Sequence, residues 1–141
     1  MNKTITITSA PQAQGRPRFT VRGGHAIAFN PHKDTKNWYR LQISGQIEAV
    51  ITSPIELEMT FYMPIPKSTS KKKSKEMLEN KIKHIKKPDI DNLQALILNC
   101  FTGIVYRDDS QVYKIIAFKK YSAIPRTEIK IFWQEDNEED A

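Results

Sequence analysis

The stretch IELEMTFYM, residues 55–63, constrains the fold more than any other part of the sequence. Apolar side chains occupy every second position, and the two prolines of PIP end the pattern. Because successive side chains of a strand point to opposite faces, this alternation predicts a strand with one buried and one solvated face. A sheet built from such strands needs helices to cover its apolar face.

The rest of the chain mixes segments with strand-like and helix-like periodicity. Alternation predicts strands at residues 3–8, 111–119 and 127–133, and a hairpin of residues 18–21 and 26–29 around Gly23-Gly24. Helical spacing predicts helices at residues 34–50, 74–80 and 90–101, with Trp38 in the core and Gly103 ending the last helix. We therefore expect one α+β domain, residues 1–134, in which a mostly antiparallel mixed sheet packs with helices.

Composition limits the setting in which the chain works. Hydrophobic residues make up 39% and charged residues 27% of 141 positions, as in an ordinary globular domain. The single Cys100 cannot form an internal disulfide, and no CxxC pair or His/Cys cluster suggests zinc. No apolar run suits a signal peptide or a membrane helix. These features predict a soluble, cytoplasmic protein without a membrane partner or a small-molecule cofactor.

Basic residues dominate the chain outside its last seven residues. That tail, EDNEEDA (135–141), carries five of the sixteen acidic residues and is expected to be disordered, so the remainder holds 22 basic residues against 11 acidic ones. Residues 67–87 contain nine lysines and two acids, unlike a surface charged only for solubility. A polyanion partner is therefore expected, with a merely solvated surface as the alternative. The predicted nucleic-acid contacts are Arg16, Arg18, Lys71, Lys72, Lys73, Lys86 and Lys87.

Two pairs of aspartates flank an apolar segment of this basic chain. Asp89 and Asp91 lie in PDID at the start of the predicted helix 90–101, and Asp108 and Asp109 follow that helix in YRDDSQ. Local roles exist for both pairs, because carboxylates cap helix starts and acids are common in turns. A cap needs only one carboxylate, however, so one acid at the helix start has no local explanation.

The two pairs would form a metal pocket if the turn after the helix folds back beside the helix start. Residues two apart in extended geometry point the same way, so Asp89 and Asp91 are able to converge on one cation. Three or four carboxylates without cysteine or histidine favour Mg²⁺, for which Mn²⁺ can substitute. Such a site within a basic surface is typical of phosphodiester hydrolysis.

These motifs resemble those of the RusA family of Holliday junction resolvases. The resemblance rests on KKPDIDN, GIVYRDDSQV and the lysine-rich segment that follows, with PQAQGRPRF and MPIPKSTSKKK further upstream, and covers roughly residues 5–133. It implies a homodimeric, Mg²⁺-dependent endonuclease that cuts four-way DNA junctions by paired nicks during recombination and repair. Such resolvases are often carried by phages and prophages.

The resemblance assigns roles to particular residues. It makes Asp89, Asp91 and Asp109 the catalytic, metal-binding acids, with Asp108 as a further metal ligand, Gln111 as a neighbour and Asn92 as an orienting residue. The family's lysine four residues after the second aspartate, and its acid four residues further on, are replaced here by Ala95 and Asn99. On a helix, positions 91, 95 and 99 share one stripe, so the family's lysine would lie over the metal pocket.

Three readings of Ala95 and Asn99 remain open. Another lysine, Lys86, Lys87 or Lys114, takes the place of the missing one; the chain binds junctions without cutting them; or the two residues mark an engineered, inactivated form. The first hypothesis for the function is therefore a Mg²⁺-dependent junction resolvase, and the second is a catalytically silent or inactivated protein that binds junction DNA. The third is a basic scaffold whose acids serve only as caps and turns.

Overall fold

The computed structural model describes residues 1–14, 18–22, 25–29 and 33–134. Within these ranges the chain forms three helices, six strands and one short 3₁₀ turn. In chain order they are β1 (Asn2–Ile7), β2 (Arg18–Arg22), β3 (His25–Phe29), α1 (Lys33–Ser44), β4 (Ile55–Pro64), α2 (Lys71–Leu78), α3 (Ile90–Phe101), η1 (Asp109–Gln111), β5 (Val112–Ser122) and β6 (Arg126–Trp133). Arg16, the Gly23-Gly24 pair and the acidic tail lie outside the described residues.

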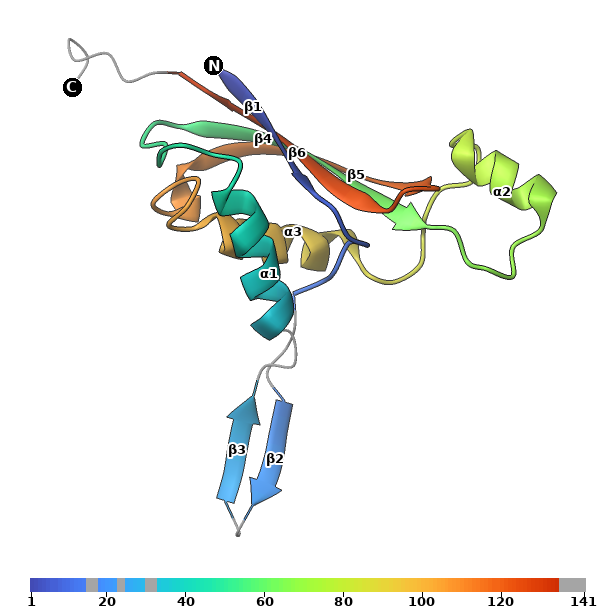
Figure 1. Ribbon diagram of the computed structural model, residues 1–141, viewed down its shortest axis with the longest axis horizontal. Coiled ribbons are helices and arrows are strands. Elements are labelled where there is room, and N and C mark those ends of the chain that lie inside the picture. Colours follow the sequence, from blue (N-terminus) through green and yellow to red (C-terminus); the bar gives the residue numbers. More distant parts are fainter. Residues whose placement is uncertain (15–17, 23–24, 30–32, 135–141) are drawn as a thin grey trace.

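Four strands form a mixed sheet with the order β1-β6-β4-β5 (Figure 1). β6 runs antiparallel to both β1 and β4, whereas β5 runs parallel to β4. The parallel pair is possible because a long crossover, which includes α2 and α3, connects β4 to β5. β2 and β3 form a separate antiparallel hairpin, as predicted. The expected α+β class with a mostly antiparallel mixed sheet is confirmed.

The core lies between the sheet and two helices, α1 and α3, that cover the same face (Figure 1). The alternation in β4 places one set of side chains in this core, namely Ile55, Leu57, Met59, Phe61 and Met63. They meet Leu93, Leu96 and Ile97 of α3, as the helical spacing predicted. α3, which begins beside Asp89 and Asp91, is therefore part of the hydrophobic core.

Two helices differ from their predicted form. α1 ends at Ser44 and is followed by Gly45, which stops the helix before residue 50. Trp38 is 49% exposed, because Tyr39 and Ile43, four residues apart, form the buried stripe instead. α2 begins at Lys71, three residues earlier than expected, because the Ser70 hydroxyl caps it by accepting from the Lys73 N–H (3.2 Å).

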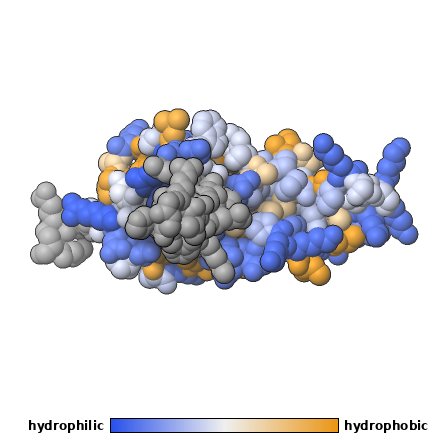
Figure 2. All heavy atoms as spheres, turned by 90° about the horizontal axis from the view of Figure 1, so that it is seen from below, coloured by the Kyte–Doolittle hydropathy of each residue, from blue (hydrophilic) through white to orange (hydrophobic). Residues whose placement is uncertain are grey.

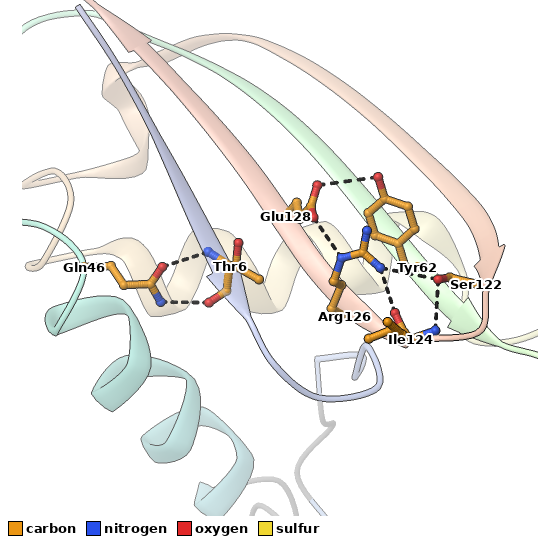
Figure 3. A network of polar contacts seen from close by, with 7 residues as sticks. All are labelled: Thr6, Gln46, Tyr62, Ser122, Ile124, Arg126 and Glu128. Atoms are coloured by element: carbon orange, nitrogen blue, oxygen red, sulfur yellow. Dashed lines mark hydrogen bonds and ion pairs between the residues drawn. The ribbon is translucent and has the colours of Figure 1, made fainter.

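Polar side chains add hydrogen bonds near the ends of three strands, β1, β4 and β6 (Figure 3). Gln46 exchanges two hydrogen bonds with the backbone of Thr6, at 2.9 and 2.7 Å, as a neighbouring strand would. On the sheet face opposite the helices, the Arg126 guanidinium stacks 3.8 Å from the Tyr62 ring centre and bonds Glu128 at 2.8 Å. None of the helices in the described part of the chain has the length and apolar character that a bilayer-spanning helix needs.

Candidate functional site

The first aspartate pair lies at the start of α3 without a full local explanation. Asp89 occupies the position before the helix, in extended geometry (φ −71°, ψ 147°), but within the described part of the chain its carboxylate makes no capping hydrogen bond. Asp91 accepts a hydrogen bond from the Asn92 N–H (2.9 Å), and both aspartates are exposed. The positive end of the helix dipole favours these charges, but capping does not account for the Asp89 carboxylate.

In the second pair, one carboxylate caps the turn and the other makes no capping hydrogen bond. Asp108 accepts from the Ser110 N–H (3.4 Å) and forms a capping box with Gln111. Asp109 is exposed next to it, and their shared side-chain hydrogen bond raises the pKa of Asp109 and lowers the pKa of Asp108. Two adjacent carboxylates repel each other when both are ionised, so a bound cation would reduce the electrostatic repulsion within this turn. Of the two carboxylates, that of Asp109 is therefore the one that does not cap the turn.

Gln111 connects the acidic turn, residues 107–111, to the segment before β4. Its Oε1 accepts from the backbone N–H groups of Arg107 (2.9 Å) and Asp108 (3.2 Å). Its Nε2 donates to Ile51 O (2.9 Å) and Ser53 O (3.2 Å). All hydrogen-bonding positions of this amide are therefore used, and the glutamine of DDSQ fixes where the adjacent aspartates lie.

The two aspartate pairs lie at opposite ends of α3 (Figure 1). α3 has 12 residues, which corresponds to about 18 Å at about 1.5 Å per residue. After the helix the chain turns at Gly103 (φ 85°), and the Tyr106 hydroxyl donates to Leu98 O (2.7 Å), which holds the acidic turn at the C-terminal end. Across the described ranges, no three Asp, Glu, His or Cys side chains form a group able to hold a metal ion. One chain therefore does not bring the two pairs together.

The predicted basic contacts lie on and after α2. Lys71, Lys72 and Lys73 are exposed and occupy the first turn, where the helix dipole disfavours positive charge and where α2 has no acid to offset it. Lys86 and Lys87 are exposed in the segment that leads to Asp89. The end of the molecule that carries α2 is mainly hydrophilic, with scattered apolar spots (Figure 2). Arg18 begins β2, and Arg16 lies outside the described residues.

The two altered positions share the outer stripe of α3 with Asp91. Ala95 and Asn99 are half-buried, and they lie beside the fully buried row of α3. Lys114, one candidate to replace the missing lysine, pairs with Glu56 at 3.0 Å. Because Glu56 alternates with the buried Leu57, this pair lies on the sheet face opposite α3. Of the candidate lysines, Lys86 and Lys87 are therefore better placed than Lys114.

A lysine that sequence reasoning did not select supports the segment before Asp89. The Lys119 ammonium donates to Lys86 O (2.9 Å) and to Pro88 O (3.1 Å). Two residues further along β5, the Tyr121 ring packs on the His84 ring with their centres 5.1 Å apart. Burial and the nearby Lys119 charge lower the pKa of His84. The sequence offered one signal for Lys119: it occupies a position of β5 at which the alternation places side chains on the helix-facing side of the sheet.

The sequence of this chain matches a known protein family. The model of the family described as "Endodeoxyribonuclease RusA" matches residues 9–132, which include both aspartate pairs, Gln111 and the lysine-rich segment. The chain belongs to the RusA family. It is also similar to "Uncharacterized protein YqaN" of Bacillus subtilis (strain 168), with 35% identity over 132 residues that cover 90% of this chain and 93% of the relative. Membership of the RusA family supports a nuclease function in Holliday junction resolution.

Proposed function

We propose that this chain is a homodimeric, Mg²⁺-dependent endodeoxyribonuclease that resolves four-way DNA junctions by paired nicks. The observation that carries the proposal is the start of α3, where the exposed Asp89 and Asp91 lie within five residues of the exposed Lys86 and Lys87. Since the Asp89 carboxylate has no capping partner among the described residues, it is available to a cation. The same segment thus offers cations to phosphate and anions to a metal, in a chain of the RusA family.

The chemistry of the available ligands fits a hard divalent cation. Asp89, Asp91 and Asp109 would hold it, with Asp108 beside them, and all four offer only oxygen atoms. Mg²⁺, or Mn²⁺ in its place, would supply a Lewis acid and an activated water. Lys86 and Lys87 would hold the DNA backbone next to these acids. A cation would also offset the repulsion between the adjacent Asp108 and Asp109 carboxylates, which contributes to the raised pKa of Asp109.

A second copy of the chain offers a way to unite the two pairs. In a two-fold dimer, the helix start of one copy is able to lie beside the acidic turn of the other, so each site would combine Asp89 and Asp91 of one copy with Asp109 of its partner. The two sites would be equivalent by symmetry. Such an arrangement suits a substrate that must be cut at two equivalent strands.

Mixing two inactive variants tests this arrangement directly. Asp91→Asn and Asp109→Asn are each expected to abolish cleavage of an end-labelled four-way junction in Mn²⁺ or Mg²⁺. If each site combines both copies, a mixed dimer of the two variants contains one intact site and one site with both substitutions. Mixing should then restore nicking of one strand, but not paired cleavage.

Control reactions show whether the acids act through a metal and whether two copies share the site. Asp34→Asn, an exposed aspartate of α1, should leave cleavage unchanged. Excess EDTA should stop cleavage without preventing junction binding. Failure of the mixed dimer to nick, when each parent dimer exchanges subunits freely, would reject a site shared between copies. Persistent cleavage by Asp91→Asn alone would reject the metal site itself.

Ala95 favours a second candidate, a protein of the RusA family that binds junctions without cutting them. Its methyl group occupies the position where the family resemblance places a lysine, and Lys114 lies on the opposite sheet face. This candidate predicts salt-sensitive junction binding and no products at any metal concentration. Ala95→Lys together with Asn99→Asp should then introduce cleavage, whereas the same changes would alter an already active chain only in rate.

A further inference from the structure

The pre-helix loop, residues 84–89, is held against β5 by the side chain of Lys119. Its ammonium group bridges two backbone carbonyls, Lys86 O at 2.9 Å and Pro88 O at 3.1 Å. The second carbonyl belongs to the residue directly before Asp89. Since a lysine ammonium has three N–H donors, two of them are used to fix the backbone of this loop.

The position of Lys119 in β5 explains why its side chain reaches the loop. It lies between Ala117 and Tyr121 on the helix-facing side of the sheet, where a polar group needs a partner. Lys120, the next residue, points to the opposite face and lies 5.5 Å from the centre of the Phe118 ring. Two adjacent lysines therefore carry the same charge but only one contacts the loop.

Further contacts fix the chain before and after the two aspartates. The His84 ring packs on Tyr121, with ring centres 5.1 Å apart and planes inclined by 58°. On the other side of the acids, the Asn92 carbonyl accepts from the Gln14 N–H (2.9 Å). The backbone that carries Asp89 and Asp91 is thus fixed before and after the aspartates, while their carboxylates stay exposed.

We propose that Lys119 is a positioning residue, which sets the direction of the Asp89 and Asp91 carboxylates by holding the backbone that precedes them. The proposal rests on the proposed metal-dependent function. Lys119 acts through the Lys86 and Pro88 carbonyls, so it does not replace the lysine that is missing at Ala95. Loss of a group that orients metal ligands without touching the metal typically changes metal affinity or activity by about 10- to 100-fold. Because Lys119 contacts only backbone carbonyls, we expect its loss to change the metal affinity and not the rate at saturating metal.

Three variants test this role. Lys119→Met keeps the aliphatic chain but removes both hydrogen bonds, Lys119→Arg keeps donors for the two carbonyls, and Lys120→Met removes the neighbouring charge from the opposite face. Hydrogen exchange of the amides in residues 84–93 reports the loop directly. The Mn²⁺ concentration for half-maximal cleavage of a four-way junction reports the metal ligands.

Lys119→Met should accelerate exchange in residues 84–93 and raise the half-maximal Mn²⁺ concentration by about tenfold. The rate at saturating Mn²⁺ should remain close to that of the parent, and thermal unfolding should show that all variants are folded. Lys119→Arg should recover most of the parent behaviour. Lys120→Met should leave both the exchange and the Mn²⁺ requirement unchanged.

The outcomes separate this inference from the proposed function. Equal exchange and equal Mn²⁺ requirement in Lys119→Met and Lys120→Met would overturn the positioning role. A loss of rate that saturating Mn²⁺ does not restore would also overturn it. If neither the parent nor any variant cuts junctions, the nuclease proposal fails. Mn²⁺ affinity, measured by water-proton relaxation, then replaces cleavage as the readout. An affinity unchanged by Lys119→Met would overturn the positioning role, and a weakened affinity would support it.

Discussion

Gln111→Ala should destabilise the chain far more than the loss of a surface glutamine normally does. The substitution removes four hydrogen bonds: two to the exposed N–H groups of Arg107 and Asp108, and two partly buried ones to Ile51 O and Ser53 O. With about 0.5 kcal/mol for each exposed bond and about 1 kcal/mol for each partly buried bond, the free energy of unfolding should fall by about 3 kcal/mol.

Urea unfolding followed by far-ultraviolet circular dichroism measures this change. The midpoint should shift while the dependence on urea keeps its slope, because the folded core is intact. Gln134→Ala, an exposed glutamine after β6, is the matched control and should change the free energy by less than about 0.5 kcal/mol. A loss below about 1 kcal/mol in Gln111→Ala would refute the claim that this amide fixes the acidic turn.

Three further predictions follow from groups outside the acid pairs. Burial raises the pKa of Cys100 to about 11, so its thiol should resist Ellman's reagent in the folded chain and react in urea; rapid reaction without urea would contradict its placement. Because the pKa of His84 is lowered in the folded chain, the unfolded chain binds more protons than the folded chain below about pH 6.5. The free energy of unfolding should therefore fall as the pH decreases through this range, and it should fall less in His84→Gln. Identical pH dependence of the two proteins would contradict this. Replacing Lys71, Lys72 and Lys73 by alanine should reduce the slope of log binding constant against log salt by up to about 3 for a four-way junction, and an unchanged slope would exclude them from phosphate contact.

The elements with strong periodicity could be predicted from the sequence, but their pairing could not. The alternation in residues 55–63 identified β4, and the spacing of α3 identified its buried side. The parallel pairing of β4 with β5 depends on the path of a crossover, which no local pattern encodes. The prediction that Trp38 lies in the core was wrong. It relied on the size and apolar character of this side chain, whereas the buried stripe of α1 is formed by Tyr39 and Ile43.

In the candidate site, too, local features could be predicted from the sequence, but contacts between residues far apart in the sequence could not. Sequence placed Asp89 and Asp91 at a helix start, and the structure confirms that location. Asp108 and Gln111 have the D-x-x-Q spacing of a capping box, a local signal for the cap that was missed. The bond from Gln111 to Ile51, 60 positions away, has no such local signal. Lys119 was missed for the same reason, because its partners are backbone carbonyls that have no signature in the sequence.

The separation of the acid pairs bears on how a complete site would form. A conformational change within one chain would have to move one pair along the length of α3, about 18 Å at about 1.5 Å per residue. Both ends of this path are fixed, at one end by Lys119 and at the other by Gln111 and the buried Tyr106. Moving either end would break partly buried hydrogen bonds and open the core, whereas association of two copies leaves each chain as it is. The internal contacts of one chain thus favour a site shared between two copies over one assembled by refolding.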